Sequence, residues 1–151
     1  MDDDAPVLQE DPALPGMKWE RREIENYICQ PETLESFARE VGAKTAGGPL
    51  LEQPAIDAAI VAMRDAIRDR AIPAALRNPD DPWWKTVKAT DEFLDLVFPD
   101  FYRRMKLYMD FRKADYYRFV PHVPEALVSD EIRQALDRIA EIAGKAQPAL
   151  E

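Results

Sequence analysis

Cysteine and histidine are almost absent from the sequence, which has one of each, Cys29 and His122, among 151 residues. One cysteine cannot form an intrachain disulfide, and the two residues together are too few for a His/Cys zinc site or a Cys-His nucleophile. Glycine is scarce too, and the pair Gly47 and Gly48 lacks the Lys-Ser/Thr that completes a phosphate-binding loop. These shortages argue against a disulfide-stabilised, zinc-dependent or self-contained ATP-binding protein.

Long hydrophobic runs are also missing, since no apolar stretch approaches the ~18 residues that a transmembrane helix requires. The sequence opens with Met1-Asp2-Asp3-Asp4, which is unlike a cationic signal peptide. We therefore expect a cytoplasmic protein that does not enter a membrane. The net charge of −9 argues against a free-standing nucleic-acid binder, whereas the hydrophobic fraction of 46% is enough for one folded domain.

Apolar residues recur at helical spacing in several segments. The first runs from Pro31, which suits a first helical turn, to a stop at Gly42, and the strongest covers residues 56–67. Residues 43–54 are predicted to form a loop. Later helices are predicted to begin at Thr90 or Asp91, at Pro99, and after Ser129, where the stripe consists of Ile132, Leu136, Ile139 and Ala143.

The overall expectation is a mainly α protein with four to six helices and at most one or two short strands. Alternation of apolar and polar residues predicts one strand at residues 17–20. Residues 1–16 are rich in proline and acids and are predicted to form an extended acidic arm, followed by a helical region over residues 17–147. In each of the aromatic pairs 83–84 and 116–117, we expect one ring in the core and one at the surface.

Two acidic pairs are candidates for binding a divalent cation such as Mg²⁺, which prefers oxygen ligands. Asp2 and Asp4 form one pair, and Glu23 and Glu25 form the other. Side chains two residues apart point the same way on a strand but diverge by roughly 200° on a helix. The alternative is that both pairs are simply solvated surface acids.

A local excess of positive charge lies between residues 103 and 118. It suggests a phosphate-facing surface for DNA, although a solvated helix face explains the same pattern. The candidate nucleic-acid-binding residues are Arg103, Arg104, Lys106, Arg112 and Arg118, and Lys113 lies in the same run of charge.

The segment from Trp19 to Ile28, followed by Pro31 and Glu32, resembles the R-E-I-E-N-Y-L-L-x-P-E signature of one family. This family is the overcoming-lysogenization-defect (OLD) and RecF-like group of AAA-type ATPases that carry a TOPRIM nuclease domain. Residues 91–94, 98–102 and 113–121 are similar to later parts of the same region, as is the last helix at 131–139. The likeness spans residues 17 to about 145, and its first motif is the specific one.

The resemblance implies the C-terminal piece of an α/β TOPRIM-containing protein. Glu25, with Glu23 as second choice, would be a metal-ligand carboxylate and a catalytic residue, and Asp2 and Asp4 would complete the family's D-x-D pair. Lys113 would be the catalytic basic residue near the scissile phosphate, where a fixed cation stabilises developing negative charge. The ATPase portion and an earlier TOPRIM strand have no counterpart here, and Ala114 replaces the family's glycine after the lysine.

We therefore expect a fragment or subunit of an ATPase-linked, Mg²⁺-dependent DNA nuclease that is inactive without its missing portion. The alternative is a non-catalytic helical module that binds a partner protein or forms a homo-oligomer. An exposed apolar patch around Trp19, Ile24 and Ile28 would favour that alternative. A third reading is a nucleic-acid adaptor that uses residues 103–118.

Overall fold

A computed structural model describes residues 18–145, and these residues are mainly helical with no strand among them. The predicted mainly α class is therefore confirmed, whereas the strand expected up to Glu20 is not formed in its described part. Short 3-10 (η1, η3, η4) and π-helical (η2) elements alternate with α-helices. In chain order they are η1 (Ile24–Tyr27), α1 (Pro31–Thr45), α2 (Pro49–Arg68), α3 (Pro73–Arg77), α4 (Trp83–Thr86), η2 (Ala89–Leu94), α5 (Asp95–Met105), η3 (Lys113–His122), η4 (Glu125–Leu127) and α6 (Asp130–Lys145).

Two compact units make up the chain. The larger runs from Arg21 to Ser129, and the described part of the smaller consists of residues 18–20 and 130–145. Nothing in residues 18–145 is both long and apolar enough to cross a membrane as a helix.

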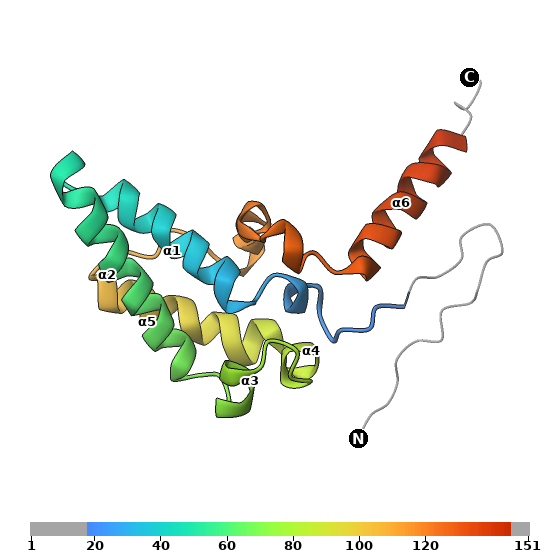
Figure 1. The fold of residues 1–151 in the computed structure, drawn as a ribbon, viewed down its shortest axis with the longest axis horizontal. Helices are drawn as coiled ribbons and strands as arrows, with labels where there is room; N and C mark the ends of the chain where they lie inside the picture. Colours follow the sequence, from blue (N-terminus) through green and yellow to red (C-terminus); the bar gives the residue numbers. More distant parts are fainter. Residues whose placement is uncertain (1–17, 146–151) are drawn as a thin grey trace. The chain divides into compact units, whose positions relative to one another are not determined.

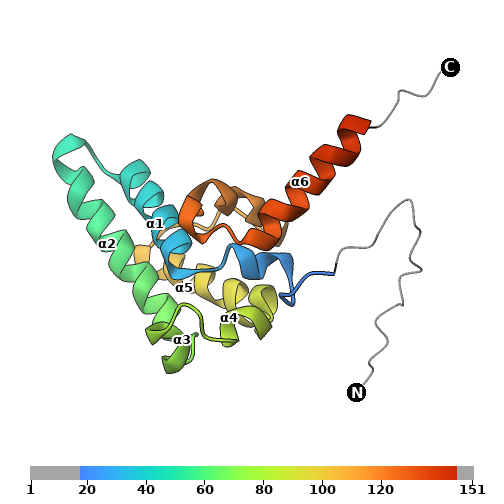
Figure 2. The same ribbon diagram turned by 45° about the vertical axis from the view of Figure 1, so that its right-hand side comes forward.

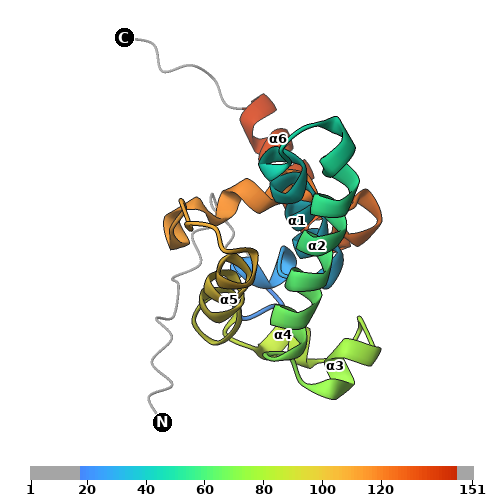
Figure 3. The same ribbon diagram turned by 90° about the vertical axis from the view of Figure 1, so that its left-hand side faces the viewer.

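Helices α1 and α2 form an antiparallel hairpin in the larger unit, as Figures 1 and 3 show. The predicted stop at Gly42 is wrong, because α1 continues to Thr45. A Cβ atom at Gly42 would lie 2.7 Å from the carbonyl oxygen of Ala55 and from Cα of Ile56. Glycine is therefore needed at this position for the close approach of two helix backbones and does not terminate the helix.

The loop predicted over residues 43–54 is much shorter in the structure. Helix α2 begins at Pro49 and contains Pro54 near its start, so only residues 46–48 separate it from α1. Proline lacks a backbone N–H, but the N–H groups of the first helical turn have no intrahelical partner, so Pro49 costs α2 nothing. The prediction failed because it treated proline and glycine only as breakers.

Pro99 lies inside α5 and does not begin a helix as predicted. A proline ring clashes with the carbonyl group four residues earlier in a regular α-helix. Here that residue is Asp95, at the point where the wider π-helical turn η2 changes to α-helix. We infer that this change of helical type makes room for the proline, and η2 and α5 therefore run as one continuous segment.

Aromatic rings from α1, α5 and η3 form the centre of the core. Phe98 and Phe119 are fully buried and stack with ring centroids 4.5 Å apart, and Phe37 packs edge-on against Phe119 at 4.8 Å. Phe111 and Tyr116 pack around them. This cluster fixes η3, which carries Lys113, against the N-terminal half of α5.

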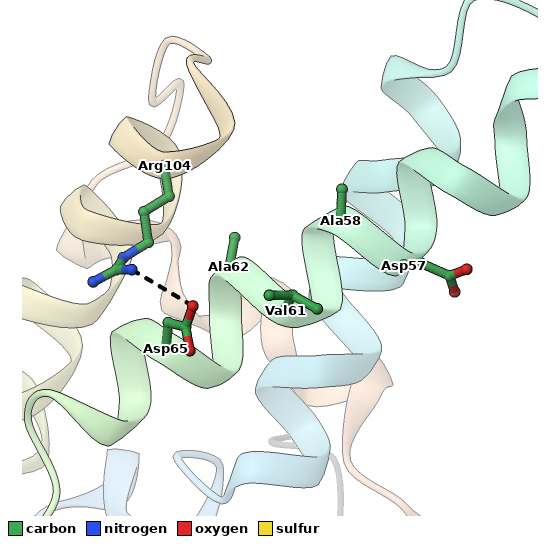
Figure 4. Close-up of a pocket in the computed structure, with 6 residues that line it drawn as sticks. All are labelled: Asp57, Ala58, Val61, Ala62, Asp65 and Arg104. Atoms are coloured by element: carbon green, nitrogen blue, oxygen red, sulfur yellow. Dashed lines mark ion pairs between the residues drawn. The ribbon is translucent and has the colours of Figure 1, made fainter.

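Helix α5 packs beside α2 (Figure 2), and ion pairs around Arg104 tie the two together, of which Figure 4 shows the pair with Asp65. The Arg104 guanidinium lies 2.7 Å from Asp69, 3.0 Å from Asp100 and 3.7 Å from Asp65. Asp100 also pairs with Arg103. Burial raises the pKa of Asp100, but the hydrogen bonds from Arg103 and Arg104 outweigh it, so the pKa is lowered.

Within the described chain, helix α6 forms the smaller unit together with residues 18–20. The backbone N–H of Glu20 donates to the Glu131 carboxylate at 2.8 Å. The helix begins directly after Ser129, as predicted, and the apolar stripe is largely exposed, with Leu136 at 59% and Ile139 at 57%. This face of α6 therefore contributes little to a core within its own unit.

Candidate functional site

The segment that carries the family resemblance is held in place by a buried asparagine. Asn26 is fully buried, and its side-chain amide donates to the backbone oxygens of Trp84 and Val87, at 3.0 Å in each case. Its Oδ1 accepts the backbone N–H of Glu23 at 2.8 Å. The backbone N–H of Arg22 adds a bond to the carbonyl of Lys85 at 3.0 Å. These bonds fix η1 against the segment that joins α4 to η2.

The two motif glutamates have different environments. Glu23 accepts the backbone N–H of Thr90 at 2.9 Å, which satisfies one of the free donors at the start of η2. The side chain of Glu25 makes no hydrogen bond or ion pair with any residue between 18 and 145, and it is half-buried. Glu23 therefore has a structural role, whereas Glu25 is a carboxylate that the fold does not use.

Lys113 lies at the start of η3 and pairs with Asp91 in η2. Its Nζ is 3.0 Å from Asp91 Oδ1, and both side chains are more than half exposed. The hydrogen bond to Asp91 raises the pKa of Lys113, desolvation opposes it, and the charges of Asp91, Asp95 and Glu23 add to the increase. The same hydrogen bond lowers the pKa of Asp91. Exposed pairs of this kind contribute little to stability, so the lysine remains able to exchange partners.

Tyr116 is buried one turn further along η3, and its hydroxyl donates to Asp95 at the start of α5. Burial raises the pKa of Tyr116 most, and the hydrogen bond to Asp95 and the charges of Asp95, Glu25 and Asp91 raise it further. The phenol therefore stays protonated at neutral pH and acts as a hydrogen-bond donor. Its neighbour Tyr117 is 68% exposed, which confirms the expected division into one core and one surface ring.

Of the two predicted glutamates, Glu23 lies close enough for its charge to act on the predicted Lys113. The charge of Glu25 acts instead on Tyr116, three residues further along η3. The sequence alone did not indicate that Asp91, Asp95 or Tyr116 belongs to this group of residues. It indicated Asp91 as a helix cap and Tyr116 as one ring of a core-and-surface pair. The signal that could have indicated both is that they lie in segments covered by the resemblance.

The predicted metal ligands are only partly within the described chain. Asp2 and Asp4 lie outside residues 18–145, so the structure describes nothing of their position. Among the residues that are described, no group of three or more His, Cys, Asp or Glu side chains is arranged to hold a metal ion. Oxygen ligands of the right chemistry for Mg²⁺ are present in Glu23, Glu25, Asp91 and Asp95. The metal site stays a prediction.

The predicted nucleic-acid-binding residues do not form one surface of free cations. Figure 4 shows Arg104 on α5 directed at Asp65 on α2, across an open hollow that Val61 and Ala62 also line. Arg104 is held by three carboxylates and Arg103 by one. Lys106 ends α5 in a left-handed conformation (φ 55°), and Arg112 precedes η3. Arg118 lies over the Phe111 ring, 5.7 Å from its centroid.

Two further aromatic or basic residues have structural roles. Trp84 is buried, and its indole N–H donates to the backbone oxygen of Ala75 at 3.0 Å, while Trp83 is half-buried against the same core. His122 is hydrogen-bonded to Ser36 at 3.0 Å through Nδ1 and lies 2.9 Å from Glu40 through Nε2, which joins the end of η3 to α1.

Comparisons of the chain with protein-family models, with curated proteins and with solved structures gave no match. The functional argument therefore depends on the residues and their geometry alone.

Proposed function

We propose that this chain is a cytoplasmic subunit or fragment of a Mg²⁺-dependent DNA nuclease and supplies one half of a composite phosphodiester-cleaving site. Glu25 would be a metal ligand, with Glu23 and the nearby aspartates as further oxygen donors. Lys113 would stabilise negative charge on the phosphate. A TOPRIM-bearing, ATPase-linked portion would supply the remaining ligands, so the chain alone would not cleave DNA.

The observation that carries the proposal is the meeting of three distant segments at one place. Residues 23–25, 91–95 and 113–116 place Glu23, Asp91 and Asp95 where their charges act on Lys113, and place Glu25 where its charge acts on Tyr116. Glu25 supports the proposal most, because a half-buried carboxylate with no partner in the described chain is not explained by the fold.

The metal-binding part is tested by titrating the full chain with Mn²⁺ and following paramagnetic broadening of its backbone amide signals. We expect weak binding, because the site is incomplete, with broadening centred on residues 23–25, 91–95 and 113–116. Glu25→Gln should reduce the broadening at these residues, and the exposed Glu52→Gln should leave it unchanged. Broadening that is confined to other acids, or that is equal in both variants, would count against a metal role for Glu25.

The composite-site part is tested by incubating the same chain with linear and supercoiled DNA in Mg²⁺ and Mn²⁺. We expect no cleavage. Cleavage by the purified chain that disappears in Lys113→Gln would show that the site is complete, and the subunit proposal would then be wrong while the nuclease proposal would stand.

A non-catalytic interaction module is the second candidate, and exposed apolar side chains favour it. Trp19 is 40% exposed and Ile24 is 54% exposed, although they belong to different compact units, and Ile28 packs against the core. On α6, Ile142 is also 45% exposed, next to Leu136 and Ile139. Light scattering coupled to size-exclusion chromatography distinguishes the cases, because a module of this kind should self-associate, and a monomer at all concentrations would oppose it.

A further inference from the structure

A pocket of about 250 Å³ lies between α1, α5 and the segment around η3, and it shares no residue with the carboxylate and lysine cluster. Its apolar lining includes the buried ring of Phe37 and the half-buried Leu107. Its polar and charged lining includes Tyr102, Asp110 and Arg118.

Tyr102 is the feature that suggests a ligand. It is 6% exposed, yet its hydroxyl forms no hydrogen bond with the described part of the chain. The fully buried side-chain polar atoms that lack a partner among residues 18–145 are Gln30 Oε1 and Thr33 Oγ1, so the Tyr102 oxygen must reach open space at the pocket. Burial raises the pKa of Tyr102 to about 12, so at neutral pH the hydroxyl is an unused donor.

Two opposite charges act on this hydroxyl. Asp110 and Arg118 line the same pocket as Tyr102, where the charge of Asp110 raises the pKa of Tyr102 and that of Arg118 lowers it. Neither Asp110 nor Arg118 forms an ion pair with another residue in the range 18–145, and they do not pair with each other. The other two charged lining residues, Glu40 and Lys44, neutralise each other in an ion pair.

The pocket is therefore lined by one unpaired cation, one unpaired anion, one neutral hydrogen-bond donor and apolar side chains. A simple anion would be attracted by Arg118 and repelled by Asp110, and a simple cation would meet the reverse arrangement. A ligand that carries both charges satisfies the two residues together. The volume lies below the usual range for drug-sized ligands, which restricts the ligand to a small molecule.

We propose that this pocket binds a small zwitterion with an apolar body, the chemistry of a free hydrophobic amino acid. The carboxylate would accept hydrogen bonds from Arg118 and the Tyr102 hydroxyl, and the ammonium group would pair with Asp110. The side chain of the ligand would lie on Phe37 and Leu107. This inference does not depend on the proposed nuclease role.

Isothermal titration calorimetry with three related probes tests the proposal on the full chain. L-Phenylalanine carries both charges, 3-phenylpropionate lacks the ammonium group, and phenethylamine lacks the carboxylate. We expect L-phenylalanine to bind with a dissociation constant on the order of 1 mM, given its number of atoms. Each singly charged probe should bind roughly tenfold more weakly, because it leaves one charged wall residue without a partner.

Variants of exposed residues assign the two charges without risk to the fold. Arg118→Gln should weaken the binding of L-phenylalanine and 3-phenylpropionate but not that of phenethylamine. Asp110→Asn should weaken the binding of L-phenylalanine and phenethylamine but not that of 3-phenylpropionate. Tyr102→Phe should weaken the binding only of the two probes that carry a carboxylate, L-phenylalanine and 3-phenylpropionate. The exposed Arg112→Gln is the matched control. The proposal is overturned if no binding of L-phenylalanine is detected at a concentration of about 20 mM, which is 20-fold the expected dissociation constant. It is also overturned if 3-phenylpropionate binds as tightly as L-phenylalanine, or if neither Arg118→Gln nor Asp110→Asn changes the affinity for L-phenylalanine.

Discussion

The buried amide of Asn26 should be one of the most important polar groups for stability, and Asn26→Ala tests this. The substitution removes two donors and one acceptor at a position with no solvent exposure. It leaves the carbonyl groups of Trp84 and Val87 and the N–H of Glu23 without this partner. An unsatisfied buried polar group costs about 1–3 kcal/mol, so we expect a loss of about 3–5 kcal/mol in the free energy of unfolding.

Urea unfolding followed by far-UV circular dichroism measures this loss. With a slope of about 2 kcal/mol per molar urea, the midpoint should fall by roughly 2 M. Asn78→Ala is the matched control, because Asn78 is exposed and its Oδ1 accepts a single bond, from the N–H of Asp80 at 3.0 Å. It should cost about 1 kcal/mol or less. If the two variants differ by less than about 1 kcal/mol at an unchanged slope, Asn26 does not anchor η1 as described.

Three further predictions concern the packing, the pH response and the cysteine. Gly42→Ala should destabilise the chain by about 1–3 kcal/mol, because its Cβ would collide with the backbone of α2, whereas Gly144→Ala, with open space around it, should be neutral or slightly stabilising in the same urea assay. Because the pKa of Asp100 is lowered in the folded chain, its carboxylate stabilises the fold at pH values above the unfolded pKa of about 3.9. This stabilisation is lost as the pH falls through the folded pKa. Unfolding between pH 2 and 6 should therefore depend less on pH in Asp100→Asn than in the parent chain, and identical profiles would contradict this. Cys29 is fully buried, and burial raises its pKa to about 12. It should react with a thiol reagent only after unfolding in urea, and rapid reaction of the native chain would show that the core opens.

The secondary structure could be predicted where apolar periodicity was strong. The helices around residues 31–42 and 56–67 and the last helix are all present. Three of the failures arose because proline and glycine were taken to mark where a helix ends or begins. Pro49 and Pro99 lie within helical segments, and Gly42 lies inside α1, where it permits close contact with α2. Tertiary packing decides such positions, and a local pattern does not contain it.

The candidate site could be predicted only in part for a similar reason. The sequence indicated Glu23, Glu25 and Lys113 because they fall in recognisable motifs. It did not indicate Asp91 or Asp95, because their membership depends on how η2 and α5 pack against η3. The charge run at residues 103–118 was read as one surface. Arg103 is instead paired with Asp100 on its own helix, and Arg104 is engaged by Asp100, Asp65 and Asp69, since α5 packs against α2.

The motif at residues 21–28 also shows how structural and functional reasons for a residue can be separated. Arg21 donates to the backbone oxygen of Asn26 at 2.6 Å, Asn26 binds the α4–η2 segment, and Glu23 binds the start of η2. Each of these residues would be required by the fold even in a chain without catalytic activity. A resemblance through them therefore supports common structure more than common chemistry.

Glu25 and Lys113 do not share this explanation. Glu25 has no partner among the described residues, and the Lys113 pair with Asp91 is exposed and contributes little to stability. Replacing both should leave the unfolding free energy almost unchanged, whereas replacing Asn26 should not. If the double variant Glu25→Gln/Lys113→Gln proves as unstable as Asn26→Ala, the two residues belong to the fold, and the proposed site loses its main support. If it is stable and loses the Mn²⁺ response, these two side chains are present for a ligand and not for the fold.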